Sequence, residues 1–155
     1  MNITYKQLDW TNKPEWQAMV ETICADLENK AFFLPYTEDE YKTMLSPDTG
    51  FVIGAFSGGG DLIGFCVMLI TPDHCEMDGA MVLPEYRNQG IQTRMNELRI
   101  AHARQIGAKK IIVKIHPECV ASIRACEKVG FVPGETKTMS SGVLRTIFEL
   151  PLKAE

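Results

Sequence analysis

The chain has 155 residues, a formal net charge of −4 and a hydrophobic fraction of 45%. Domains commonly run to about 100–200 residues, and a chain of this size buries enough surface to fold without disulfides or a metal. We therefore expect one globular domain over residues 1–155. The acidic balance, without a basic run, argues against nucleic acid as a partner.

No apolar stretch reaches the roughly 20 residues that a transmembrane helix needs, so we expect no membrane partner. The first residues also lack the basic-then-apolar pattern of a signal peptide, which predicts a cytoplasmic protein. His116 and Cys119 lie three residues apart but lack the further ligands of a zinc site, so no metal is expected. The number of cysteines is odd, and no two of them form a Cys-x-x-Cys motif. We therefore expect all of them to be reduced thiols: Cys24, Cys66, Cys75, Cys119 and Cys126.

The first third of the chain predicts one strand and two helices. The strand covers residues 3–8. A second, shorter helix is expected after Thr37, where Thr37 and Glu40 have the spacing of a capping box. The first helix is amphipathic, because apolar residues recur at three- and four-residue steps: Trp16, Met19, Val20, Ile23 and Leu27.

Two strands of a hairpin are predicted at residues 51–56 and 62–70, joined by a turn that contains three glycines. This turn connects strand to strand and precedes no helix, which argues against a phosphate-binding loop. Further strands are predicted at residues 75–83, 109–115, 131–138 and 143–150, and helices at residues 90–106 and 120–129.

Residues 75–115 form a β-α-β unit, so its two strands should be parallel with a right-handed crossover. The hairpins on either side of this unit are antiparallel. The sequence therefore predicts an α+β (mixed α/β) fold, with a mixed, mostly antiparallel sheet of six to seven strands and about four flanking helices.

The strongest chemical signal lies in residues 82–93, where a strand ends, a short loop turns and a helix begins. Unpaired N–H groups and a partial positive charge at a helix start suit a phosphate, and Gly90 allows close approach of a ligand. Arg87 and Arg94 add positive charge, and no acid occurs between Glu85 and Glu97. An ordinary strand-to-helix turn explains the pattern equally well. The motifs of phosphate-binding NTPases and dinucleotide enzymes are absent.

The run Arg87-Asn88-Gln89-Gly90-Ile91-Gln92 resembles the acyl-CoA-binding motif Arg/Gln-x-x-Gly-x-Gly/Ala of the GNAT superfamily of N-acetyltransferases. Residues 116–131 resemble the family's next helix, which usually ends in Tyr-Glu-Lys-x-Gly-Phe. The resemblance implies the GNAT fold, with a splay between the fourth and fifth strands. It also implies acetyl-CoA as co-substrate and transfer of its acetyl group to a primary amine.

The resemblance further implies where the co-substrate binds. Pantetheine should lie in the splay, beside Met81, Val82 and Leu83, with Ser122 on the far side. Three positions depart from the family pattern: Gln92 replaces Gly or Ala, Cys119 replaces an Asn that commonly bonds the pantetheine arm, and Cys126 replaces a Tyr. The pyrophosphate should rest on the amides of one loop: Arg87, Asn88, Gln89, Gly90, Ile91, Gln92 and Thr93.

Acyl transfer to an amine needs a base, because an ammonium group has no lone pair. Glu76 and Asp78 are the candidates, since residues two apart on a strand share a face. Glu76 matches the general base of the histone-type branch, and Asp78 matches an acid of other branches. Buried neighbouring carboxylates raise each other's pKa, although solvated side chains near a sheet edge are an equal alternative. His74 and His116 are secondary candidates.

Two further groups are candidates, one for stabilising the tetrahedral intermediate and one for protonating the departing thiolate. A strand amide near Val82 is expected to bind the oxyanion. Cys126 stands where many relatives place a Tyr that protonates the thiolate, and it is the candidate acid. Its side chain is much shorter, which favours a buried packing role and leaves water or another side chain as the acid.

Three functions stay open at this stage. The first is an acetyl-CoA-dependent N-acetyltransferase that acts, by direct transfer with general-base help, on a small-molecule or peptide amine. The second is a catalytically silent acyl-CoA-binding sensor, which Cys119 and Cys126 favour. The third is an interaction domain without cofactor, which Gln92 favours. The aromatic segment 32–36 is expected to shape the acceptor pocket, and the end strands could pair in a homodimer.

Overall fold

The computed structural model describes residues 2–25 and 36–152, so Leu27 and most of the aromatic segment 32–36 lie outside the described residues. The element order agrees with the sequence prediction. The helices and strands are β1 (Thr4–Leu8), α1 (Lys13–Ala25), α2 (Glu38–Leu45), β2 (Gly50–Phe56), β3 (Leu62–Ile70), β4 (Cys75–Val82), the 3₁₀ helix η1 (Pro84–Tyr86), α3 (Ile91–Gln105), β5 (Lys110–Ile115), α4 (Val120–Lys128), β6 (Val132–Thr138) and β7 (Leu144–Pro151).

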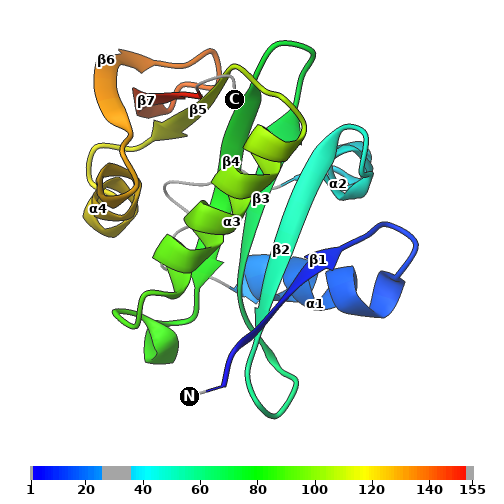
Figure 1. Ribbon diagram of the computed structural model, residues 1–155. Helices are drawn as coiled ribbons and strands as arrows, with labels where there is room; N and C mark the ends of the chain where they lie inside the picture. Colours follow the sequence, from blue (N-terminus) through cyan, green and yellow to red (C-terminus); the bar gives the residue numbers. More distant parts are fainter. Residues whose placement is uncertain (1, 26–35, 153–155) are drawn as a thin grey trace.

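The strands form one seven-stranded sheet in the order β1-β2-β3-β4-β5-β7-β6. Only β4 and β5 pair in parallel, and all other neighbours are antiparallel. The predicted mixed fold and its single β-α-β unit are therefore confirmed. The helix α3 lies across one face of the sheet with α4 beside it, while α1 and α2 lie behind the other face (Figure 1).

Local sequence explains how α2 begins. The Thr37 side chain accepts a hydrogen bond from the Glu40 N–H at 3.2 Å, and the Glu40 carboxylate accepts one from the Thr37 N–H at 2.9 Å. This is the reciprocal capping box that the spacing predicts.

Within the described residues, no helix combines the length and the apolar character that a membrane crossing requires.

The strands β4 and β5 separate along their length. They pair from Cys75 with Ile111 to Met77 with Val113, and no further pair follows although both strands continue. The splay that the family resemblance implies is thus present. It leaves backbone groups of β4 without a strand partner on that side, between α3 and α4 (Figure 1).

The strand β4 carries a bulge at the start of the splay. Met68 on β3 pairs with Met77, but Cys66 pairs with Ala80, so Asp78 and Gly79 together oppose one β3 residue. A bulge of this kind reverses the alternation of side chains along a strand. Before it, Cys75 and Met77 pack into the core under α3, and after it Ala80 and Val82 do so.

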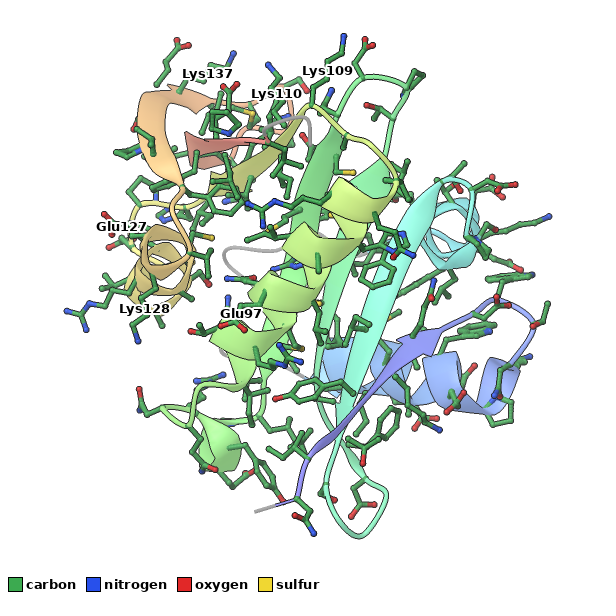
Figure 2. All side chains as sticks on the ribbon, in the orientation of Figure 1. Glu97, Lys109, Lys110, Glu127, Lys128 and Lys137 are labelled. Atoms are coloured by element: carbon green, nitrogen blue, oxygen red, sulfur yellow. The ribbon has the colours of Figure 1, made fainter. Side chains whose placement is uncertain are left out.

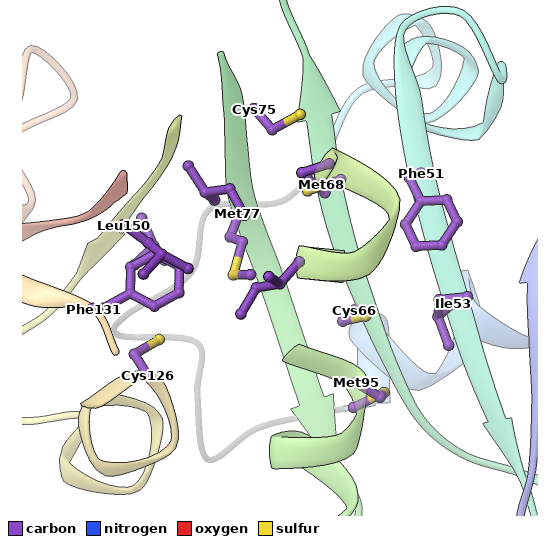
Figure 3. Packing of buried hydrophobic residues seen from close by; sticks show 14 of the residues in the cluster. Phe51, Ile53, Cys66, Met68, Cys75, Met77, Met95, Cys126, Phe131 and Leu150 are labelled. Carbon is purple, nitrogen blue, oxygen red and sulfur yellow. The ribbon is translucent and has the colours of Figure 1, made fainter. Parts of the chain in front are cut away.

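The side-chain alternation of β4 before the bulge determines which face the predicted base candidates occupy. Because Cys75 and Met77 point into the core under α3, Glu76 and Asp78 point to the opposite face of the sheet. Figure 3 shows part of that core, with Met77 of β4, Cys66 of β3 and Met95 of α3. We call the face of β4, β5, β7 and β6 opposite α3 the outer face.

Candidate active site

The residue that precedes α3 has a left-handed backbone conformation, which glycine adopts more easily than other residues. Gly90 is its N-cap, with φ of 81°, and no side chain caps the helix start. The preceding loop also contains Asn88 with φ of 63°, a conformation that Asn tolerates better than most residues. No acidic residue occupies the first turn. The first amides of α3 therefore face a position suited to an anion.

A cleft of about 670 Å³ lies in front of this helix start. Ten of the twelve residues predicted to bind the co-substrate line it: Met81, Val82, Arg87, Asn88, Gly90, Ile91, Gln92, Thr93, Cys119 and Ser122.

Leu83 and Gln89 are not among the described residues that line this cleft. The Leu83 N–H donates to the Ile63 carbonyl on β3 at 2.9 Å, and its side chain packs against the core. The exposed Gln89 side chain turns back to the Glu85 carbonyl at 3.4 Å. Each residue is therefore engaged away from the cleft.

Two cations of α4 line the cleft and were missed by sequence reasoning. Arg124 and Lys128 are one helical turn apart, so they share one side of α4. Figure 2 labels Lys128 on α4. Their four-residue spacing was the available signal. Other residues not predicted also line the cleft: Ala80, Tyr86, Glu118, Val120, Ala121 and Ala125.

A smaller cavity of about 70 Å³ lies inward of the cleft, at the splay. The cleft and this inner cavity share four lining residues: Ala80, Gln92, Cys119 and Ser122. The Gln92 Nε2 donates to the Ser122 hydroxyl at 3.3 Å, which joins α3 to α4 at this junction. The long side chain that departs from the family pattern therefore stands between the two cavities.

The backbone of β4 faces the splay at Val82. The Leu83 N–H points to β3, and successive residues of a strand direct their backbone groups to opposite sides. The Val82 N–H and carbonyl therefore point to the splay. The Arg87 Nε donates to that carbonyl at 2.9 Å, which anchors the loop to the end of β4.

Asp78 lines the inner cavity and is held by a tyrosine. The Tyr36 hydroxyl accepts a hydrogen bond from the Gly79 N–H at 3.2 Å and hydrogen-bonds to the Asp78 carboxylate. Asp78 is exposed to solvent, but the protein atoms around its carboxylate still desolvate it, and this desolvation and then the negative charge of Glu76 raise its pKa. The Tyr36 bond opposes this rise. A carboxylate with a raised pKa beside a cavity suits a base.

Glu76 has a different environment from Asp78. Its Oε1 lies 3.0 Å from the Lys114 Nζ of β5, and the Glu76 side chain is 28% exposed. It is not among the described residues that line either cavity. The two predicted carboxylates thus share the outer face, but only Asp78 borders the space where an acceptor could meet the co-substrate.

Cys126 lies at the base of the inner cavity and is 2% exposed. Figure 3 shows it on α4, near Phe131 and Leu150. Burial raises the pKa of its thiol to about 11. A reference thiol has a pKa of about 8.5, so proton transfer from Cys126 to a departing thiolate would be uphill.

His116 and Cys119 both line the inner cavity, whereas His74 lies elsewhere. His74 bonds to Thr71 in the turn before β4 and is not among the described residues that line the two cavities. His116 lines the inner cavity, and its Nδ1 accepts the Glu118 N–H at 3.1 Å. Burial raises the pKa of the Cys119 thiol. Over residues 2–25 and 36–152 no cluster of three metal-ligating side chains occurs.

The buried cation Arg99 was also not anticipated. It is 2% exposed and lines the inner cavity from α3. Its Nη1 donates to the Val67 carbonyl at 2.8 Å, and its Nη2 donates to the Asn96 side chain. Val67 is the β3 residue opposite the bulge, so Arg99 supplies the partner that the ladder lacks there.

The family model described as the acetyltransferase (GNAT) family matches residues 16–131. The chain therefore belongs to this family of acetyltransferases, and acetyl-CoA is the co-substrate that membership implies. A search of curated proteins found no match.

Solved structures share the fold. One is the NatC complex bound to Gag peptide and CoA, with a TM-score of 0.84, 23% identity, and coverage of 99% of this chain and 100% of that one. The ribosomal-protein-S18-alanine N-acetyltransferase from Escherichia coli has a TM-score of 0.75, 17% identity and coverage of 97% and 94%. An acetyltransferase of the GNAT family from Streptococcus pneumoniae has a TM-score of 0.78, 13% identity and coverage of 98% and 100%.

Proposed function

We propose that this protein is an N-acetyltransferase that moves the acetyl group of acetyl-CoA directly to a primary amine. The observation that carries the proposal is the continuity of the site. The uncapped start of α3 opens into the large cleft, and this cleft adjoins the inner cavity that Asp78 borders. Bound acetyl-CoA would supply a thioester-activated acetyl group to this inner cavity.

The residues present fit the phosphates and the pantetheine arm. The first amides of α3 would hold the pyrophosphate, because Gly90 has no side chain within the cleft and no acid lies in the first turn. Arg124 and Lys128 add positive charge on the opposite wall. The splayed backbone of β4 at Val82 would bind the amides of the arm.

Asp78 would act as the general base. It would take one proton from the acceptor ammonium, which frees the nitrogen lone pair. The C–N bond then forms and the C–S bond breaks, while the Val82 N–H binds the carbonyl oxygen during attack. The second nitrogen proton passes to the departing sulfur through water, since Cys126 holds its proton too strongly.

A catalytically silent acyl-CoA-binding module is the second candidate. The hydrogen bond between Gln92 and Ser122 favours it, because this bond narrows the junction between the cleft and the inner cavity. In that case the protein would hold the co-substrate without presenting the thioester to an amine.

Calorimetric titration with acetyl-CoA, CoA and adenosine 3′,5′-bisphosphate tests the site, and a thiol-release assay with a panel of amines tests turnover. We expect micromolar binding, carried largely by the phosphates, and CoA release that depends on an amine. Binding without release for any amine would select the silent module. Absence of binding at millimolar ligand would reject both candidates.

A further inference from the structure

The antiparallel pairing of β3 with β4 is interrupted at the bulge. The Leu83 N–H donates to the Ile63 carbonyl at 2.9 Å, and hydrogen-bonded positions alternate along an antiparallel pair. Continued in the same register, this alternation would direct the Gly79 N–H to the Val67 carbonyl. Between these two described strands, Val67 has no partner in the observed register. The donor and the acceptor of one ladder hydrogen bond therefore need other partners.

Side chains from opposite faces of the sheet supply these partners. The Gly79 N–H donates to the Tyr36 hydroxyl at 3.2 Å, and Tyr36 packs against the core under α1 and α2. The Val67 carbonyl accepts a hydrogen bond from the Arg99 Nη1 at 2.8 Å, and Arg99 belongs to α3 on the other face. The bulge is thus held from both faces, by one acceptor and one donor.

Arg99 is a costly residue for this position. It is 2% exposed, and Cys66 and Met68 of β3 lie beneath α3 beside it (Figure 3). Its Nη2 donates to the Asn96 side chain, but its buried Nε has no hydrogen-bond partner among the described residues. No ion pair within the described part of the chain includes it. An apolar side chain would avoid the cost of burying this charge, which favours a role beyond packing.

Arg99 and Asp78 line the same inner cavity, and Asp78 is the first residue of the bulge. The positive charge of Arg99 lowers the pKa of Asp78, against the effects of desolvation and of Glu76. Among the described groups around Asp78, Arg99 is the one buried cation. The other titratable groups that act on Asp78 or share its cavity are Tyr36, Glu40 of α2, Glu76, Lys114 of β5, His116, Cys119, Cys126 of α4 and Arg145 of β7.

We propose that Arg99 is a positioning residue for Asp78: its guanidinium occupies the Val67 carbonyl, keeps the bulge of β4 and so presents the Asp78 carboxylate to the inner cavity. This inference rests on the proposed transferase function. Without the guanidinium, the Val67 carbonyl would be free to accept the Gly79 N–H. A regular ladder holds no extra residue, so Asp78 and Ala80 would not both keep their places.

A double-mutant cycle on stability tests the clamp without any need for turnover. R99M and Y36F each leave one buried backbone group without a partner, whereas in the double variant the Gly79 N–H can bond to the Val67 carbonyl directly. We therefore expect the double variant to lose less unfolding free energy than the sum of the two single losses, measured by urea unfolding. Additive losses would overturn the proposal.

I100A is the matched control for this cycle. Ile100 follows Arg99 on α3 and is buried in the same core at 5% exposure. Its combination with Y36F should be additive, because Ile100 supplies no hydrogen bond to the bulge. R99Q, whose amide is uncharged, takes the place of R99M if that variant does not fold.

The position of the base is tested by charge. Carbon-13 NMR titration of the Asp78 carboxyl should show a higher pKa in R99M than in the natural protein, and R99K should restore it because lysine keeps the positive charge. With an amine that supports CoA release, R99M should lower kcat by about 10- to 100-fold, the effect of losing a charged hydrogen bond. The KM for acetyl-CoA should stay within a few-fold.

The kinetic and structural outcomes separate the two proposals. The acidic limb of the R99M profile should move to higher pH, while the limb of R99K should stay near that of the natural protein. Equal falls in kcat for both variants with unmoved limbs would reduce Arg99 to a packing role. If the natural protein releases no CoA with any amine, the transferase function fails, and the stability cycle and the Asp78 titration still decide whether Arg99 holds the bulge and its carboxylate.

Discussion

The Tyr36 hydroxyl accepts a hydrogen bond from the Gly79 N–H at 3.2 Å, across 43 positions of sequence. A Cβ on Gly79 would lie 2.5 Å from the same oxygen, so the Tyr36 side chain would have to shift if any other residue stood at this position. The bulge turns this N–H toward Tyr36 and places Asp78 within reach of the hydroxyl. The tyrosine therefore acts as a positioning residue for the proposed base.

Tyr36→Phe should move the acidic limb of the kcat/KM profile to higher pH. The Tyr36 bond favours the ionised form of Asp78 and lowers its pKa, so its loss lets desolvation and Glu76 raise that pKa further. A base works when deprotonated, so activity then rises only at higher pH. Tyr5→Phe on β1, far along the sheet order from β4, is the control. If the acidic limb of the Tyr36→Phe profile stays at the pH of the natural protein, Tyr36 does not position the catalytic base.

Asp78→Asn should lower kcat/KM by about 10²- to 10⁴-fold, the usual contribution of a general base. The fall in kcat/KM caused by Glu76→Gln should be at least tenfold smaller than that caused by Asp78→Asn. It should also move the acidic limb to lower pH, because the charge of Glu76 raises the pKa of Asp78. Steady-state rates from pH 5 to 9 would measure both effects. The reverse order of losses would assign the base to Glu76.

Gly90→Glu should weaken acetyl-CoA binding by about a hundredfold, because it places a carboxylate at the proposed phosphate site. Calorimetric titration measures the change. Gly107→Glu is the matched control: Gly107 follows the other end of α3, with φ of 79° against 81° for Gly90, and a Cβ at either glycine meets no atom within 4 Å. Both substitutions therefore impose similar backbone strain. Equal losses of acetyl-CoA affinity in the two variants would reject the proposed phosphate site.

Cys126→Ala should leave kcat within a few-fold of the natural protein. Burial raises the pKa of this thiol to about 11, so it is a poor acid for a thiolate whose reference pKa is about 8.5. The variant should lose roughly 1 kcal/mol of unfolding free energy through the small cavity it creates. A hundredfold fall in kcat with unchanged acetyl-CoA affinity would instead make Cys126 catalytic.

Much of the architecture follows from local sequence. The continuous apolar run that follows a glycine-rich turn predicts β3 at residues 62–70, as observed, and the start of α2 follows from Thr37 and Glu40. The loop before α3 is equally local, because one glycine and a helix start define it. These features depend on interactions between residues a few positions apart, which a single sequence displays directly.

The arrangement around Asp78 depends on contacts that no local pattern contains. The bulge arises from the register of β4 against β3, and it sets which side chains face the outer face. Tyr36 meets Gly79 only after the sheet has assembled. The sequence by itself determined the elements, their order and the family motif. The tertiary structure decided which carboxylate borders the cavity and which cations accompany it, because strand register and long-range packing bring these side chains together.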